Sequence, residues 1–394
     1  MWVTGAVAAS ALWVAIRLGG HGFDQLDMRI YRMGATALWH GTGLYAAIDP
    51  GTGLPFTYPP FAALLMLPAV LLPAGMAGLG MGVASCVALA RLCHVSVTRI
   101  GGIPRLGYAA SFWIVLGVAF VSEPVLSTLS FGQVNLILVW LVVEDLTRGR
   151  GQWLGVGTGI AAAVKLVPGV FLVYLWLAGP RRAALRGVLT FAVADLVTAA
   201  LFWSDSRTFW SGMFADAGHV GGIPYQANQS ALGVVARALG TETPALWMYL
   251  PSVVALGVSL ALATWFARHG DRNRGLILTA VGGLLASPIS WSHHWVWWVP
   301  LACLLLADVA AGRPGARALL AATVLVFTTR LIWWPPSADD AALSYNHLQQ
   351  ALTAAYFVLG VAILAWHAHM AWSQRGRSQD HRQLVQATAT TSST

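Results

Sequence analysis

The sequence has very little charge for its length. Only 10% of its 394 residues are Asp, Glu, Lys or Arg, compared with about 25% in an ordinary soluble protein. Hydrophobic residues make up 57% of the chain. A chain so poor in charge cannot cover its own surface with polar groups, so lipid must cover much of it. The composition excludes a soluble multidomain protein and predicts an all-α polytopic membrane protein.

Cysteine and lysine are also scarce, and each absence excludes a class of site. The three cysteines lie in apolar runs and predict neither a disulfide framework nor a zinc knuckle. Lys165 is the only lysine, which excludes a phosphate-binding loop because that motif requires lysine after glycine. No HExxH or Asp-x-Asp motif occurs, which argues against a metal hydrolase and a magnesium-assisted nucleotide-sugar site. The net charge of +8 fits a positive-inside bias, so no nucleic-acid partner is expected.

The sequence does contain a series of apolar runs. Because a helix needs about 20 apolar residues to cross a bilayer, we expect a bundle of roughly 11–12 membrane helices. The candidate spans are Met1–Leu18, Ala74–Cys93, Leu106–Val121, Gly132–Leu146, Trp153–Ala178, Val188–Trp203, Leu246–Ala267, Gly275–Leu285, Trp295–Ala311, Ala316–Trp334 and Leu348–Trp366. The first run has no basic region or cleavage site and is expected to remain as a membrane helix. Pro59–Leu72 is short for a crossing and is expected to be half-inserted or broken.

Arginine orients these segments. The arginine-rich connections and the polar tail, residues 373–394, are expected to face the cytoplasm. The first outer loop, residues 19–58, and the second large outer loop, residues 204–245, then face the other side of the plasma membrane. Residues 1–372 are expected to form one membrane domain, followed by a disordered tail.

Trp153–Ala178 has arginine near both ends, so a single crossing would place arginine on both sides of the membrane. We expect this segment to enter the membrane and return, with Lys165 and Pro168 near its turn. The alternative makes it a single crossing and gives Pro59–Cys93 two crossings. That alternative puts several arginines on the outer side, against the positive-inside rule, so the first topology is preferred.

The first outer loop contains two acidic residues and an amphipathic pattern. Asp24 and Asp27 precede a segment whose polar residues would share one face of a helix, namely Arg29, Arg32, Thr36 and His40. Such a helix suits the membrane interface. Two roles are open for Asp27: a cap of that helix or a functional carboxylate.

Two further outward-facing segments are rich in polar side chains. Ser287-Pro288-Ile289-Ser290-Trp291-Ser292-His293-His294 separates two spans and is either an interfacial belt or part of a site. Adjacent residues on a helix point about 100° apart, so one histidine is expected to face a cavity, with His294 favoured. Tyr225-Gln226-Ala227-Asn228-Gln229-Ser230 offers amides and hydroxyls suited to sugar hydroxyls.

Glu123 and Lys165 are ionisable residues at or near membrane depth, where charges are costly. They are either a structural ion pair or part of a functional site. Gly155-Val156-Gly157-Thr158-Gly159 resembles a nucleotide-binding fingerprint but lies within an apolar run. We interpret these glycines as a site of close helix packing.

The ordered set of motifs is similar to that of a known family. The motifs are Asp27-x-x-x-Tyr31, Phe56-Thr57-Tyr58-Pro59-Pro60-Phe61, Glu123-Pro124, Gly132-Gln133-Val134-Asn135, Lys165-Leu166-x-Pro168, Asn228-Gln229-Ser230 and Ser287-Pro288-Ile289-Ser290-Trp291-x-His293-His294. They resemble the actinobacterial polyprenol-phosphate-mannose-dependent α-(1→2)-mannosyltransferases, glycosyltransferase family 87 of the GT-C superfamily. The resemblance runs from about residue 20 to residue 370 and preserves the order of the motifs.

The resemblance implies an activity and a set of site residues. It implies a GT-C helix bundle with a juxtamembrane helix in the first outer loop, and transfer of mannose from polyprenyl phosphate mannose to a mannolipid. The acceptor would be of the phosphatidylinositol mannoside or lipomannan type, and no cofactor is expected. It implies Asp27 as base, with Asp24 as the alternative. For the leaving phosphate we expect His293, His294, Lys165 and Arg29 to supply positive charge or hydrogen bonds. The implied substrate-binding residues are Asp24, Arg29, Tyr31, Tyr58, Glu123, Gln133, Asn135, Lys165, Asn228, Gln229 and Trp291.

Three other interpretations compete with this one. A transporter or flippase would also contain ionisable residues and broken helices within the membrane. Against it, the polar residues concentrate on one side and no inverted repeat is visible. A GT-C arabinofuranosyltransferase would use another lipid-linked sugar. A membrane scaffold without activity does not explain Asp27 or the two histidines.

Overall fold

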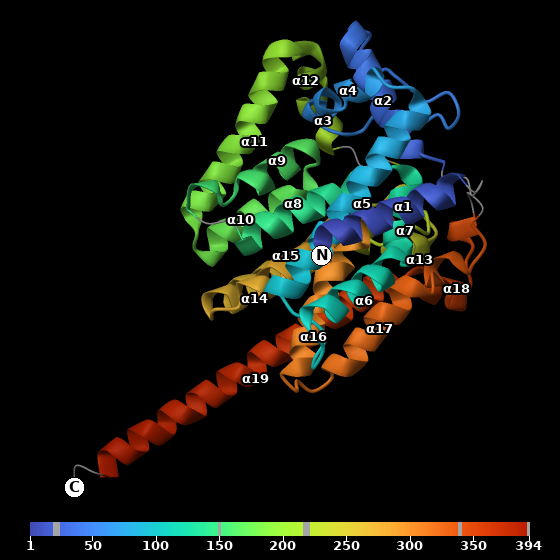
Figure 1. The fold of residues 1–394 in the computed structure, drawn as a ribbon. Coiled ribbons are helices and arrows are strands. Elements are labelled where there is room, and N and C mark those ends of the chain that lie inside the picture. Colours follow the sequence, from blue (N-terminus) through green and yellow to red (C-terminus); the bar gives the residue numbers. More distant parts are fainter. Residues whose placement is uncertain (19–23, 149–150, 216–220, 338–340, 392–394) are drawn as a thin grey trace.

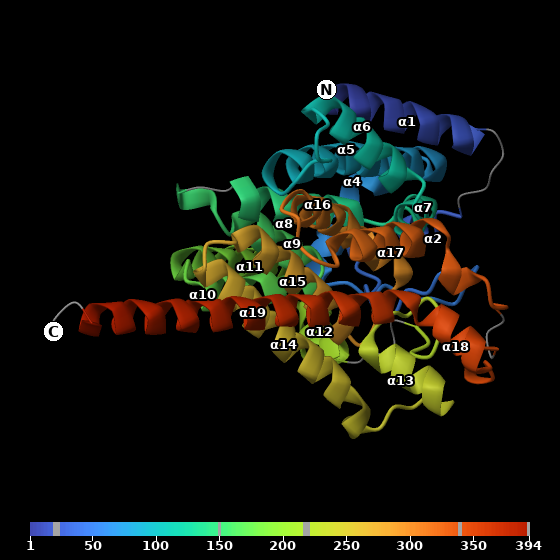
Figure 2. The same ribbon diagram turned by 90° about the horizontal axis from the view of Figure 1, so that it is seen from below.

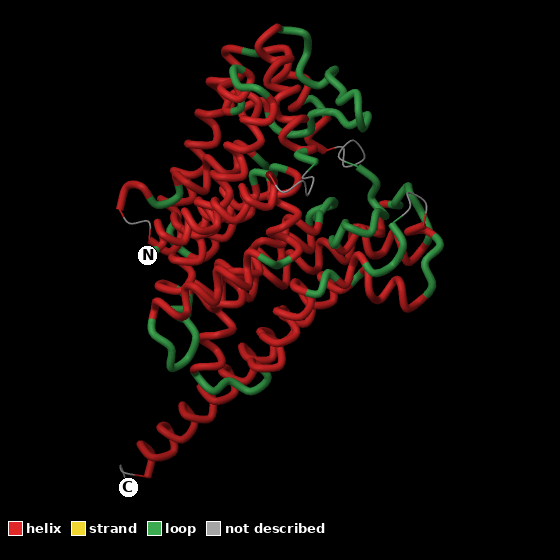
Figure 3. The backbone as a smooth tube through the Cα atoms, turned by 45° about the vertical axis from the view of Figure 1, so that its right-hand side comes forward, coloured by secondary structure: helices red, strands yellow, loops and turns green. Residues whose placement is uncertain are grey.

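The computed structural model describes residues 1–18, 24–148, 151–215, 221–337 and 341–391. Within these ranges the protein is a bundle of helices joined by loops (Figures 1 and 3), and its only β pairings are isolated bridges at Ile48–Pro55 and Asn228–Trp291. The prediction of an all-α protein is confirmed.

In the described part of the chain, four helical segments are long and apolar enough to cross a membrane. They are α5 (Ala74–Arg99), α11 (Arg181–Leu201), Leu246–Arg268, which joins η5 (Leu246–Tyr249) to α14 (Leu250–Arg268), and Ala355–Arg375 of α19 (Ala355–Thr391). A fifth span is formed if α6 (Tyr108–Phe120) and α7 (Glu123–Phe131), which meet at 63°, are counted together. The other apolar runs form shorter or broken helices. The number of apolar runs in the sequence therefore exceeds the number of long helices.

The remaining helices are shorter. The α-helices are α1 (Trp2–Leu18), α2 (Leu26–His40), α3 (Pro60–Leu65), α4 (Leu67–Val70), α8 (Asn135–Arg148), α9 (Val156–Val164), α10 (Val170–Ala178), α12 (Trp203–Trp210), α13 (Ala231–Leu239), α15 (Arg272–Ala286), α16 (Trp298–Ala310), α17 (Ala316–Thr328) and α18 (His347–Thr353). The 3₁₀ turns are η1 (Gly151–Trp153), η2 (Val167–Gly169), η3 (Met213–Ala215), η6 (Ser292–Trp297), η7 (Leu331–Trp333) and η8 (Ala341–Leu343).

Pro59–Leu72 is broken, as expected, and Trp153–Ala178 is interrupted where its turn was expected. Pro59–Leu72 forms α3 and α4, which are separated at Met66. Trp153–Ala178 is interrupted at Lys165, whose backbone is extended with φ −149°, and Pro168 lies in η2 just beyond. An interrupted helix leaves backbone groups without helical partners and places a polar side chain at the break. The direction in which this segment crosses stays a prediction.

The glycines at 155–159 pack closely against other helices, as the sequence predicts: Gly155 and Gly159 against α11, and Gly157 against α8. A Cβ atom on Gly159 would lie 2.3 Å from the carbonyl oxygen of Gly187, and one on Gly155 would lie 2.1 Å from that of Ala183. Asp145 at the end of α8 accepts hydrogen bonds from the N–H of Gly155 and from the hydroxyl of Thr158. The motif is therefore used for helix contact and for fixing the start of α9.

A buried ion pair and a hydrogen bond made by Arg274 join three helices. Arg274 of α15 donates two hydrogen bonds, of 2.9 and 2.6 Å, to Asp308 of α16. It also donates to His367 of α19 at 2.9 Å. Helix α19 then projects far beyond the bundle (Figures 1 and 2), and it continues through residues 373–391, where the sequence predicts a disordered tail. Residues after Gly376 include no proline or glycine, which permits the helix to continue.

Candidate active site

Helix α2 holds Asp27 at the edge of the bundle. One face of this helix is buried, including Ile30 and Tyr31, whereas Arg29, Arg32 and the other predicted polar residues are half-buried or exposed. The amphipathic helix predicted for the first outer loop is therefore present. The capping role open to Asp27 is wrong, because Gln25 occupies the N-cap position and Asp27 lies in the first helical turn.

The carboxyl group of Asp27 is half-buried and has an unusual acidity. Burial raises the pKa of Asp27 to about 7, while the positive charge of Lys165 and a hydrogen bond from Gln133 partly oppose that rise. A carboxylate whose pKa is near neutrality takes up a proton far more readily than an exposed one. This is the property required of a general base.

Tyr31, Tyr58 and Gln133 form a hydrogen-bonded triangle beside Asp27. The hydroxyl of Tyr31 donates to Oε1 of Gln133 at 2.7 Å, and Nε2 of Gln133 donates to the hydroxyl of Tyr58 at 2.9 Å. The two tyrosine hydroxyls are 3.3 Å apart. These contacts bring together the first outer loop and the turn before α8, which are about a hundred positions apart in the chain. They also fix the amide that faces Asp27.

Lys165 extends the same polar cluster toward the histidine turn, η6. Its Nζ atom donates to Oδ1 of Asn135 at 3.1 Å and lies 2.9 Å from Nε2 of His294. The ammonium has only hydrogens to offer, so Nε2 of His294 accepts and the ring proton is on Nδ1. Nζ also lies 5.2 Å from the centre of the Tyr58 ring. Lys165 therefore connects the tyrosine triangle to η6.

The two histidines have different surroundings, as the sequence predicts. His294 lines a small cavity together with Lys165. His293 is buried against Phe131, and its backbone carbonyl accepts hydrogen bonds from Thr128 and Asn135. Its Nε2 atom has no partner among the described residues. The geometry thus favours His294 as the histidine that meets a substrate.

Asp24 and Arg29 lie at the exposed margin of this cluster. Arg29 forms an ion pair of 2.6 Å with Asp24 and lies 3.7 Å from Asp49. A guanidinium shared between two carboxylates is already neutralised, which reduces its use for a phosphate. Asp24 in turn is an exposed carboxylate with a direct cationic partner. The structure therefore favours Asp27 over Asp24 as the base.

Glu123 does not pair with Lys165, and the ion-pair interpretation is wrong. Its Oε1 atom accepts hydrogen bonds from Ser127, Ser292 and Trp333 at 2.7–2.9 Å, and its Oε2 atom accepts one from Tyr356 at 2.8 Å. All four donors are neutral. Since the carboxyl group is fully buried, these bonds replace its hydration and tie η6 to α7, η7 and α19.

Asn228 and Gln229 are fully buried and hold the loop before η6 in place. Asn228 donates to the carbonyl oxygens of Ile223 and Pro288. Gln229 donates to those of Gln226 and Thr353. The Trp291 ring packs edge-on against Tyr225, and its backbone pairs with that of Asn228. Because both amides are occupied by the backbone, they contribute to the site by positioning the loop.

A cavity of about 40 Å³ lies beside Lys165 and His294. Ser287 and Ser290 also line it. Sequence reasoning included these serines in a motif but gave them no role, because spacing does not show which hydroxyl faces a cavity. Among the described residues no group of three or more His, Cys, Asp or Glu side chains is arranged to hold a metal ion. The metal independence of the protein stays a prediction.

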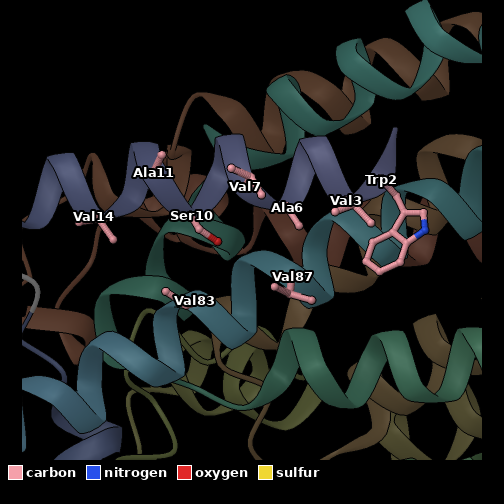
Figure 4. Close-up of a pocket in the computed structure, with 9 residues that line it drawn as sticks. All are labelled: Trp2, Val3, Ala6, Val7, Ser10, Ala11, Val14, Val83 and Val87. Carbon is pink, nitrogen blue, oxygen red and sulfur yellow. The ribbon is translucent and has the colours of Figure 1, made fainter.

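A separate apolar groove lies between α1 and α5 (Figure 4). Its volume is about 520 Å³, and Trp2, Val7, Val83 and Val87 are among its lining residues. Ser10 is the one polar side chain in its lining. The groove contains no titratable group, so the candidate reaction site is the cluster around Asp27 and Lys165.

A helical membrane protein in which a carboxylate of near-neutral pKa shares one cluster with a lysine and a histidine has the parts of a group-transfer enzyme. Comparison with known proteins defines this class further. The model of glycosyltransferase family 87 matches residues 56–288. The chain belongs to this family and is a glycosyltransferase.

Characterised relatives cover most of the chain. A polyprenol-phosphate-mannose-dependent α-(1-2)-phosphatidylinositol pentamannoside mannosyltransferase of Mycobacterium tuberculosis is 34% identical over 375 residues, or 92% of this chain and 85% of the relative. A polyprenol-phosphate-mannose-dependent α-(1-2)-phosphatidylinositol mannoside mannosyltransferase of Mycolicibacterium smegmatis is 35% identical over 333 residues, or 77% of this chain and 74% of the relative. No solved structure matches the chain.

Proposed function

We propose that this protein transfers mannose from polyprenyl phosphate mannose to a phosphatidylinositol mannoside and forms an α-(1→2) linkage. The donor, the linkage and the acceptor class are those named for the similar mycobacterial enzymes. The observation that carries the proposal is the polar cluster in which the Lys165–His294 pair lies close enough to Asp27 for the charge of Lys165 to lower its pKa. It combines a base with a cationic group, which are the two parts that a lipid-phosphate donor requires.

The chemistry is one direct displacement. A β-mannosyl phosphate that gives an α-mannoside is inverted at C1, so the acceptor hydroxyl attacks as the phosphate leaves. Asp27 takes the proton of that hydroxyl. Lys165, with the Nδ1–H of His294, stabilises the charge on the departing phosphate. Tyr31, Tyr58 and Gln133 hold the base in position, and Glu123 holds the turn that contains His294.

The same proposal places the reaction on the outer face of the plasma membrane. The arginine-rich connections lie on the opposite side from the first outer loop in the preferred topology. Helix α2 has the amphipathic character of an interfacial helix, which suits a donor and an acceptor that both reside in lipid.

The test is transfer by the purified protein in lipid nanodiscs. We expect labelled mannose to move from polyprenyl phosphate mannose to phosphatidylinositol mannosides, and an α-(1→2)-specific mannosidase to release it. Matched reactions contain GDP-mannose or a polyprenyl phosphate pentose as the donor. Transfer from either of these instead would contradict the proposed donor, and transport of lipid-linked mannose without transfer would favour a flippase.

A further inference from the structure

The hydroxyl of Ser290 is buried but has no hydrogen-bond partner among the described residues. The rest of this residue is firmly held. Its N–H donates to Oδ1 of Asn228 at 2.9 Å, and its carbonyl oxygen accepts from the N–H of Gln229 at 2.7 Å. A buried polar group without a partner is costly. The precise fixing of the backbone beside an unused hydroxyl points to a ligand that this hydroxyl meets.

The cavity lined by Ser290 has one polar side and one apolar side. Its volume of about 40 Å³ exceeds the roughly 10–15 Å³ that a water-sized oxygen needs. The polar lining consists of Ser290, Ser287, Asn135, Lys165 and His294. The apolar lining consists of Leu138, Val139, Val167, Pro168, Leu284 and Trp297. An oxygen-bearing head group attached to a hydrocarbon matches this division.

The charge at the cavity favours an anionic oxygen. In the part of the chain that the structure describes, no carboxylate lies within 4.0 Å of the Lys165 ammonium. Its hydrogen-bond partners are the neutral side chains of Asn135 and His294. Hydrogen bonds from an ammonium to an ionised oxygen are stronger than those to neutral acceptors. The Lys165 ammonium can therefore still form a stronger, charge-assisted hydrogen bond, which a phosphate oxygen would accept.

We propose that Ser290 binds the phosphate of the lipid donor, with one phosphate oxygen in this cavity between the Ser290 hydroxyl and Lys165. The inference rests on the proposed function. When the C1–oxygen bond of the mannosyl phosphate breaks, its electron pair stays on the phosphate, and the acceptor oxygen forms the new bond to C1 while Asp27 takes its proton. The leaving phosphate gains charge, so the hydrogen bond from Ser290 strengthens during transfer and persists in the polyprenyl phosphate product.

The experiment measures binding of polyprenyl monophosphate to the full-length protein in nanodiscs, by microscale thermophoresis. We expect Ser290→Ala to raise Kd by about tenfold or more, the loss typical of a hydrogen bond to a charged group. Ser96→Ala is the matched control, because Ser96 of α5 is equally buried and its hydroxyl is also without a partner, yet it does not line the cavity. Its Kd should equal that of the unaltered protein.

Three results separate the possibilities. Equal Kd values for Ser290→Ala and Ser96→Ala would overturn the proposal. A weakened affinity for phosphatidylinositol mannoside, with unchanged affinity for polyprenyl monophosphate, would also overturn it, because the phosphate would then be that of the acceptor. If Ser290→Ala loses polyprenyl monophosphate binding but the unaltered protein transfers no mannose, the phosphate site would be supported and the proposed function contradicted. If Ser290→Ala does not fold, Ser290→Cys conserves the volume and replaces the hydroxyl by a weaker donor, so the same rise in Kd is expected.

Discussion

Asp27 and Lys165 influence one another through charge, without a direct ion pair. Burial raises the pKa of Asp27 to about 7, and the charge of Lys165 restrains that rise. Because the Asp27 carboxyl and the Lys165 ammonium form no direct ion pair, Asp27 can accept a proton and Lys165 can bind a phosphate. Sequence reasoning identified both residues, because ionisable groups are rare in this chain. It left open an ion pair between Lys165 and Glu123, since charge alone does not reveal the neutral donors around Glu123.

Replacing Lys165 should therefore alter the pH dependence of the reaction. The base must be ionised, so kcat/KM falls as the pH drops through the pKa of Asp27, about 7. Lys165→Met removes the charge that lowers this pKa, and the acidic limb should move to higher pH. The remaining activity should be roughly 10–100-fold lower through loss of phosphate binding. A pH profile of kcat/KM for both proteins checks this; an unchanged limb would show that the two groups are not coupled.

The raised pKa of Asp27 also predicts a cost in stability. The folded state binds the proton more tightly than the unfolded chain, whose pKa is 3.8. The stabilisation that the folded state gains from binding this proton is complete below about pH 4 and is lost as the pH rises through about 7. Asp27→Asn stays neutral, so at pH 8 its free energy of unfolding should exceed that of the unaltered protein by at most about 4 kcal/mol, and it should unfold at a higher temperature. The difference should disappear at pH 4, and equal melting temperatures at pH 8 would refute the burial effect.

Glu123 should behave as a hydrogen-bond acceptor. Glu123→Gln retains an acceptor oxygen for Ser292 and Trp333, and it should unfold close to the normal temperature. Glu123→Ala leaves several buried donors unpaired, at about 1–3 kcal/mol for each, so strong destabilisation is expected. Thermal unfolding of Glu123→Gln, Lys165→Met and the double variant should give additive effects. A double variant more stable than the sum of the two single effects predicts would be evidence for the Glu123–Lys165 ion pair and against the structure.

At the scale of elements, the breaks in the helices build the site. Lys165 occupies the interruption between α9 and α10, and His294 lies in η6 between α15 and α16. Sequence reasoning placed a turn near Lys165 and Pro168 because arginine at both ends of Trp153–Ala178 required the segment to enter the membrane and return. It ended a span at Val121 but expected a connection over residues 122–131, where the structure has helix α7 at 63° to α6. That bend depends on packing against η6, a segment distant in the sequence.

The contact between α9 and α11 should depend on the absence of side chains at the glycines. In Gly159→Ala the added Cβ would lie 2.3 Å from the backbone of Gly187, so the helices must separate. We expect destabilisation of about 1–3 kcal/mol and a reduced kcat, since α9 ends at Lys165. Gly117→Ala in α6 is the control, because nothing lies within 4 Å of its added Cβ. Similar melting temperatures for the two variants would contradict the close packing.

At the scale of the whole molecule, residues from four distant parts of the chain meet in one cluster. Asp27 and Tyr58 lie in the first outer loop, Gln133 before α8, Lys165 after α9 and His294 in η6. Their order in the sequence gives no direct sign of their contacts. Composition predicts a helical membrane protein, and the motifs predict the participants. The long-range contacts decide which residues meet substrate and which, such as Asn228 and Gln229, support the loop behind them.

The central claim is that Asp27 is the base for transfer from a lipid-linked mannose. The most direct measurement is kcat of purified Asp27→Asn with polyprenyl phosphate mannose and phosphatidylinositol mannoside, alongside Asp24→Asn and the exposed outer-loop control Glu242→Gln. We predict a fall of about 10²–10⁴-fold for Asp27→Asn, with Glu242→Gln at the normal rate. Normal turnover by folded Asp27→Asn would contradict the claim, and a comparable loss in Asp24→Asn alone would transfer the role to Asp24.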